Sequence, residues 1–264
     1  MRLVFVVLFL LPCALRAAPD VAIVVHDQAV LRAAAKSSAT PTALLWAGET
    51  VEVRGERLDY LLVYDHRRER GGFVHASQVR RLTLAATEGP ELLATLRFLR
   101  GQPGKEALGI GYAAAFIESA SAEAMKGEAG IEALDALGTL ADRLAQRASS
   151  RGTPKDEQAA LDAHLEVAAS HGVRFVTYRY DGRTHVCYDG AAFRRVLAMK
   201  STPEQRARAA IALTRAECMA GPISALERRK LDAWRGEVLD LDDETALLGW
   251  LRSRVLRRRA VIWT

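Results

Sequence analysis

Cysteine and histidine side chains are the residues of this chain best suited to covalent chemistry. Cys187 follows His185 by two residues on an expected strand, and a nucleophilic thiolate needs such a basic partner within hydrogen-bond reach. Cys218 is the only other cysteine beyond the first eighteen residues. An even pair of cysteines in an exported chain predicts a disulfide. A Cys187–Cys218 bond would leave no thiol to act as a nucleophile.

Two other patterns resemble a catalytic or metal site without completing one. Phe116-Ile117-Glu118-Ser119 resembles the Glu-Ser start of the catalytic helix of lytic transglycosylases. That chemistry needs a glutamic acid of raised pKa, but the downstream segment typical of the family is absent. His164 and His171 are seven residues apart, which differs from the i, i+4 spacing of a helical ligand pair. The sequence therefore indicates no catalytic residue, no metal ligand and no cofactor.

Aromatic side chains are the candidates for ligand binding. They are Trp46, Tyr60, Tyr64 and Phe73. Aromatic rings give a groove its stacking area, and a tyrosine hydroxyl keeps one end of the ring in water. Tyr60 and Tyr64 alternate with Leu61 and Val63. The period of a strand predicts that the two tyrosines face outward together and the two aliphatic residues inward.

Residues 20–82 consist of short apolar or alternating runs separated by turns. Strands are expected at 21–25, 29–32, 42–46, 50–54, 60–64 and 72–75. The alternation in the run 50–54 is typical of a half-buried strand. The charged run 66–70 is expected to form a solvent-exposed hairpin tip. So many short strands in so short a segment predict a small closed β-barrel.

The order of these runs carries a family resemblance. Ala29-Val30-Leu31-Arg32 and a polar loop precede the segment 44–53, and the segments 59–63 and 72–79 continue the pattern. Residues 19–82 resemble a bacterial SH3 (SH3b) domain, with Phe73 where the family usually has tryptophan. The resemblance implies an SH3-like barrel that binds cell-wall peptide or protein, beside a second domain.

Residues 83–264 are expected to form a mainly α-helical domain, because Ala, Leu, Glu and Arg recur there with helical spacing. Helices are expected at 88–100, 105–126, 130–149, 154–171, 190–199, 202–219, 223–238 and 243–259. Ser201 with Glu204 is expected to form a capping box at the start of the helix 202–219.

A β-hairpin at 173–188 is expected to interrupt these helices. Asp181-Gly182 is a strong signal for a two-residue turn. The resulting register pairs Tyr180 with Arg183, Tyr178 with His185, and Val176 with Cys187. Cys218 is expected on the apolar face of the helix 202–219. A Cys187–Cys218 bond would then join this helix to the hairpin.

The first eighteen residues predict export. Residues 1–18 carry Arg2, an apolar run at 3–11 and a small-residue region ending in Ala17-Ala18, which is the plan of a secretory signal peptide. The run is shorter than the roughly 20 residues of a membrane-spanning helix, although an uncleaved N-terminal anchor is the alternative. We expect a periplasmic or secreted bacterial protein with no transmembrane span after signal cleavage.

Arginines concentrate at the other end of the chain. The formal net charge is +5, and the last thirteen residues hold five arginines and no acid. The remainder lacks the basic surface that nucleic acid requires, so we expect no nucleic-acid partner. Leu251 and Val255 lie on one apolar arc of the last helix, Arg258 falls within this arc, and Arg254 falls beside it. A helix that binds a membrane surface keeps its charged residues off its apolar face, which is not the case here. The arginines are expected to complement the dipole at the helix C-terminus.

These observations predict an exported cell-envelope protein that binds peptidoglycan peptide or an envelope protein through its SH3b-like segment. The alternative is a divergent peptidoglycan hydrolase with its catalytic site in the C-terminal domain. A catalytic set of side chains in one pocket would distinguish the two, and the sequence shows no such set.

Overall fold

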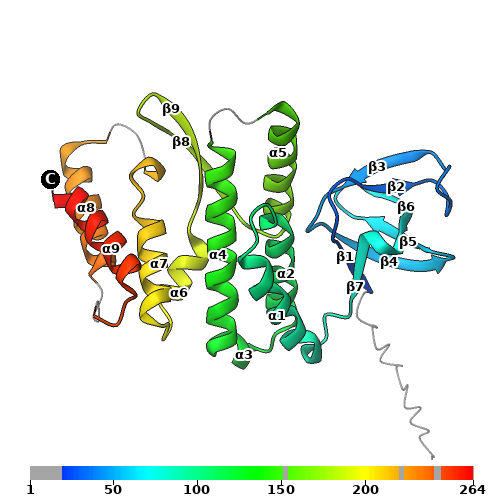
Figure 1. Ribbon diagram of the computed structural model, residues 1–264, viewed down its shortest axis with the longest axis horizontal. Coiled ribbons are helices and arrows are strands. Elements are labelled where there is room, and N and C mark those ends of the chain that lie inside the picture. Colours follow the sequence, from blue (N-terminus) through cyan, green and yellow to red (C-terminus); the bar gives the residue numbers. More distant parts are fainter. Residues whose placement is uncertain (1–19, 151–153, 220–222, 241–244, 264) are drawn as a thin grey trace, which may run out of the picture.

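The computed structural model describes residues 20–150, 154–219, 223–240 and 245–263 (Figure 1). The expected signal segment 1–18 lies outside these residues. A seven-stranded antiparallel sheet forms the N-terminal part, and a mainly helical part with one two-stranded hairpin follows, as predicted. The strands of the sheet are β1 (Val21–Val24), β2 (Ala29–Arg32), β3 (Pro41–Leu45), β4 (Thr50–Arg57), β5 (Tyr60–Asp65), β6 (Arg70–His75) and β7 (Val79–Leu82).

The sheet buries one face around its own apolar core. Its strands lie in the order β3-β2-β6-β5-β4-β1-β7, and side chains from all seven enter one cluster with Leu31, Val63 and Val74 at its centre. In β5, Leu61 and Val63 are 3% and 0% exposed, whereas Tyr60 and Tyr64 are half-buried on the opposite face. The predicted alternation of this strand is therefore confirmed.

The helices follow in a row that leads away from the sheet (Figure 1). They are α1 (Gly89–Arg100), α2 (Glu106–Ser119), α3 (Ala122–Lys126), α4 (Glu128–Ala148), α5 (Lys155–Ser170), α6 (Ala191–Leu197), α7 (Pro203–Leu213), α8 (Ala225–Leu239) and α9 (Gly249–Trp263). Helix α4 lies in the middle, with α1, α2 and α5 on its sheet side and α6 and α7 on the other. Within the described ranges, no helix is long and apolar enough to span a bilayer.

The sheet and the first helices share a hydrophobic core. Ile23 of β1 and Leu82 of β7 belong to the same buried cluster as Leu96 and Ile110. Residues in a strand point alternately to opposite faces, so β1 sends Ala22 and Val24 into the sheet's core and Ile23 toward the helices. The sheet therefore depends on the helices to cover one of its edges.

A glycine sets the distance between the two parts. Gly48 has φ +94°, and a Cβ placed on it would lie 2.3 Å from the carbonyl oxygen of Ala107 in α2. Across the same contact, a Cβ on Gly111 would lie 2.7 Å from the oxygen of Gly48. Only residues without side chains permit this approach of loop to helix.

The hairpin and its disulfide are confirmed. Strands β8 (Phe175–Tyr180) and β9 (Arg183–Tyr188) pair with Val176 opposite Cys187, in the predicted register. Asp181 and Gly182 have φ values of 49° and 69°, as a two-residue hairpin turn requires. Cys187 and Cys218 are bonded, with their Cα atoms 5.6 Å apart.

Two expected helices are shorter than predicted. The helix expected at 105–126 ends at Ser119, because Ser121 adopts an extended backbone and caps α3 by accepting from the Ala124 N–H. The helix expected at 202–219 ends at Leu213, so Cys218 lies in a separate 3-10 turn, η3 (Ala216–Cys218). The disulfide joins the hairpin to this turn rather than to a helix face.

The caps and charges of the later helices also differ from expectation. The capping box of α7 uses Thr202 with Gln205, while the Ser201 hydroxyl instead donates to the Val196 carbonyl. The last turn of α9 contains no basic residue. The explanation of its arginines as partners of the helix dipole is therefore wrong, since all five precede the last turn of the helix.

Candidate functional site

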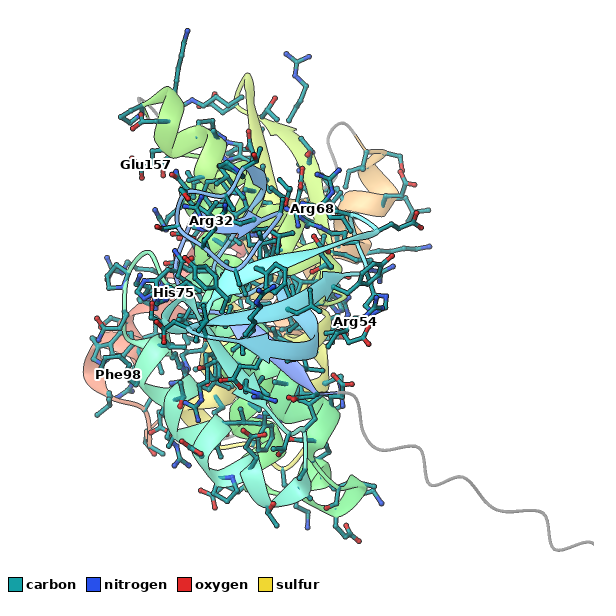
Figure 2. All side chains as sticks on the ribbon, turned by 90° about the vertical axis from the view of Figure 1, so that its right-hand side faces the viewer. Arg32, Arg54, Arg68, His75, Phe98 and Glu157 are labelled. Atoms are coloured by element: carbon teal, nitrogen blue, oxygen red, sulfur yellow. A yellow bond between two sulfur atoms is a disulfide. The ribbon has the colours of Figure 1, made fainter. Side chains whose placement is uncertain are left out.

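Three of the four predicted aromatic residues lie together on the sheet. Antiparallel pairing places Tyr60 opposite His75 and Leu62 opposite Phe73, and directly opposed side chains share one face. We call Tyr60, Leu62, Tyr64, Phe73 and His75 the aromatic face. All five are half-buried on the side opposite the core of the sheet. Figure 2 views the molecule from the sheet side, with Arg32 and His75 on one flank and Arg54 on the other.

The rings of the aromatic face are held by their neighbours. The Tyr60 and His75 rings meet edge to face with centroids 5.1 Å apart. The Arg54 guanidinium lies 3.8 Å above the Tyr64 ring, a cation–π contact that fixes both groups. Edge-to-face and cation–π contacts leave the remaining ring surfaces available to a ligand.

A charged border lies beside Tyr64. The Glu52 carboxylate accepts hydrogen bonds from Arg54 at 3.0 Å and pairs with the His66 Nε2 at 2.7 Å. The Arg54 hydrogen bond, followed by that of His66, lowers the pKa of Glu52. The border therefore presents an ionised carboxylate and a guanidinium next to an aromatic ring, which suits a ligand with both charged and apolar groups.

Trp46 lies apart from the aromatic face. Its half-buried ring packs edge to face on His164 of α5, with centroids 5.8 Å apart. The His164 Nε2 is 2.8 Å from the Asp27 carboxylate, which also accepts from the Ala47 N–H. Burial opposes the ionisation of Asp27, but the hydrogen bond and charge of His164 outweigh it and lower its pKa. The tryptophan thus fastens the sheet to α5.

A cleft of about 520 Å³ follows the seam between the sheet and α5. Its walls include Glu52 and His66 of the charged border, together with Glu49, Asp65 and Ser170. The cleft therefore begins at the edge of the aromatic face. Ligands commonly occupy concave sites with a few fixed polar groups, and the face and the cleft together form such a surface.

Buried ion pairs shape the wall of this cleft. Glu49 and Asp65 are 5% and 3% exposed. Arg68 binds Glu49 through both of its terminal nitrogens, at 2.8 and 2.9 Å, and reaches Asp65 at 2.7 Å. The hydrogen bond to Glu49 outweighs desolvation and, with Asp65, raises the pKa of Arg68. The expectation of a solvent-exposed tip at 66–70 is confirmed except at Arg68, which is half-buried because it binds Glu49.

The two histidines that were weighed as metal ligands have separate structural partners. The His171 Nε2 donates to the Gly48 carbonyl at 2.7 Å, and burial lowers the pKa of His171. His164 is engaged by Asp27. No group of three or more potential ligands occurs among the described residues. The histidines serve the sheet–helix contact.

The residues considered for catalysis do not form a catalytic arrangement in the described part of the chain. The Cys187 sulfur is held in the disulfide, while the His185 ring packs against Tyr180 at 6.3 Å. Glu118 is exposed at the end of α2, and the buried Ser119 hydroxyl donates to the Phe116 carbonyl. The Glu118 carboxylate borders a hollow of about 180 Å³ beside Leu82 and Leu84, but it stays exposed to water, whereas an acid catalyst of this kind is enclosed in apolar surroundings.

Comparison with protein-family models, with curated proteins and with solved structures finds no match to this chain. The site therefore rests on its own geometry. Sequence reasoning missed the Glu49–Arg68 pair, since nineteen residues separate its partners. The signal that was present is local: a glutamate directly follows the Ala47-Gly48 turn, and consecutive arginines follow Asp65.

Proposed function

We propose that this chain is an exported envelope-binding protein whose SH3b-like segment, residues 19–82, recognises peptidoglycan stem peptide. The observation that carries the proposal is the aromatic face, on which Tyr60, Tyr64 and Phe73 lie around Leu62, next to a charged border. Stem peptides combine short apolar side chains with carboxylates and amines. The rings would pack on the former, while Arg54 and Glu52 would pair with the latter.

Two further observations support an SH3b-like barrel. The residues that resemble the family occupy β2 to β7 in the family's order, and the sheet encloses one cluster of small aliphatic side chains. A barrel of this size leaves its outer aromatic residues for recognition rather than for its core. The half-burial of Tyr60 and Tyr64, against the full burial of Leu61 and Val63, agrees with that division.

The test is binding of the oxidised mature chain to purified peptidoglycan. The whole chain is required, because an isolated 19–82 fragment would expose Ile23 and Leu82, which the helices cover. Co-sedimentation with sacculi and calorimetric titration with soluble stem peptide should both show saturable binding. Tyr60→Ala with Tyr64→Ala should weaken it about tenfold or more, the usual effect of removing aromatic hot spots.

Tyr180→Ala is the matched control, because Tyr180 is 47% exposed on the hairpin, away from the aromatic face. It should bind like the parent protein. Unfolding midpoints of all variants should stay similar, since neither half-buried tyrosine fills the core. Unchanged affinity in the double variant, or no binding of the parent chain to sacculi, would refute the proposal.

A further inference from the structure

The inward face of α9 carries charge where apolar residues are expected. Leu251 and Val255 are 1% and 0% exposed, so this face packs on the protein. Arg258 falls on the same arc and is half-buried. An ionised side chain on a buried helix face is rare unless it is paired. Arg258 therefore requires an explanation that packing does not supply.

A cavity explains the position of Arg258. A hollow of about 330 Å³ lies between α4, α7, η3 and α9, on the side of α4 that faces away from the sheet (Figure 1). Five arginines line it, against two acids, Asp142 and Glu217. A second hollow of about 490 Å³ adjoins it and shares Ile211, Arg254 and Arg258. The space is therefore large enough for a small molecule and strongly positive.

Two of the five arginines are already neutralised by acids. Arg208 pairs with the fully buried Asp135 at 2.6 Å. Arg215 binds both acids of the lining, Asp142 and Glu217. These pairs form one wall of the hollow, and the charge of Glu217 also acts on Arg258.

Arg254 and Arg258 of α9 line both hollows. Among the residues that the structure describes, neither forms an ion pair or a side-chain hydrogen bond. Burial lowers the pKa of Arg258, and Arg235, Arg215 and Arg254 act in the same direction, with Glu217 opposing them. One helical turn separates Arg254 from Arg258, so both guanidinium groups address the same space.

We propose that this cavity binds a phosphate monoester, with Arg254 and Arg258 as its charged ligands. The two guanidinium groups of α9 match the two negative charges of a phosphate monoester, and the planar fork of arginine fits its oxygens. The adjoining hollow would take the group esterified to the phosphate. The site lies on α9 and is independent of the aromatic face, so either proposal can fail without the other.

The experiment is calorimetric titration of the oxidised mature chain at pH 8 and constant ionic strength. Glucose 1-phosphate and vesicles containing phosphatidic acid are the probes, and acetate is the monoanion control. Binding of either phosphate probe supports the site and tells whether the phosphate comes from a soluble molecule or a lipid. Failure of both, or equal affinity for acetate, would overturn the proposal.

Variants on one helix separate recognition from general charge. Arg254→Gln and Arg258→Gln should each weaken the bound probe by about tenfold, the usual loss for one charge-assisted hydrogen bond. Arg252→Gln is the control, because Arg252 is exposed on α9 and outside both hollows. It should bind like the parent chain. An equal loss of affinity in all three variants would show that binding depends only on the net charge of α9 and would overturn the assignment.

Thermal unfolding gives a readout that a structural role would not move. The phosphate probe should raise the unfolding midpoint of the parent chain and of Arg252→Gln, but not that of Arg258→Gln. Without the probe, Arg258→Gln should be at least as stable as the parent, since it removes a half-buried charge whose desolvation is unfavourable. Clear destabilisation without the probe would show that Arg258 is structural. Arg254→Gln, at an exposed position, then decides whether the cavity still binds phosphate.

Discussion

Replacing Gly48 by alanine tests the contact on which the whole arrangement of sheet and helices depends. The new Cβ would lie 2.3 Å from the Ala107 oxygen and 2.7 Å from its carbonyl carbon, whereas ordinary contacts begin at 3.4 Å. Both atoms belong to the backbone of α2, so a side-chain rotation cannot relieve the overlap. The loop and the helix would have to separate by about 1 Å, at a cost typical of overpacking, about 1–3 kcal/mol.

Backbone strain adds to this overlap. Gly48 has φ +94°, and an L-residue in the left-handed region costs about 1–2 kcal/mol. The total loss for Gly48→Ala is therefore about 2–5 kcal/mol. Gly172→Ala is the matched control, because Gly172 has φ +78° and nothing lies within 4 Å of its added Cβ. It should lose only the strain, about 1–2 kcal/mol.

The assay is urea unfolding of the oxidised chain, followed by circular dichroism and tryptophan fluorescence. Trp46 lies at the seam, so its emission should also change in the folded Gly48→Ala protein and not in Gly172→Ala. Equal losses of unfolding free energy in the two variants, with an unchanged emission spectrum, would refute the close packing of the Gly48 turn on α2.

Two further predictions concern the disulfide and a buried histidine. Cys218→Ser should lower the unfolding free energy by about 4 kcal/mol, as expected for a closed loop of this length. Reductant should then have no additional effect on this variant. Titration of two free thiols in the native, unreduced parent chain would contradict the bond. Because burial lowers the pKa of His171, its stabilisation is complete above the unfolded value of about 6.5 and is lost as pH falls below it. His171→Gln retains a donor for Gly48, so its stability should depend less on pH between about 5 and 7; an unchanged slope would exclude this role.

The sequence by itself determined the features that depend on neighbours a few residues away. The alternation of Tyr60, Leu61 and Val63 fixed which side of β5 is buried, since successive side chains in a strand must point to opposite faces. Asp181-Gly182 fixed the hairpin register, because the turn permits only one pairing. The pair of cysteines beyond the expected signal segment was enough to predict the Cys187–Cys218 bond.

Helix boundaries were less predictable, because several residues compete for the same role. Ser201 and Thr202 are both good N-caps; in the structure the Thr202 side chain accepts from the Gln205 N–H, while the Ser201 hydroxyl donates back to the Val196 carbonyl. The break at Ser121 is similar: helix-forming residues continue on both sides of it, but its side chain caps the next helix. Such choices depend on a few tenths of a kcal/mol to about 1 kcal/mol, which local propensity does not resolve.

Only the tertiary structure decided how the candidate site is assembled. Trp46 was a reasonable candidate for ligand binding because it is aromatic. Its ring instead packs on His164, which is 118 positions further along the chain, and so lies apart from the aromatic face. Arg258 was conspicuous on the apolar arc of its helix, but the cavity that explains it is built from α4, α7 and η3 as well. The reason is physical: strand alternation and turn geometry act within a few residues, whereas burial and charge compensation depend on segments that meet only when the chain is folded.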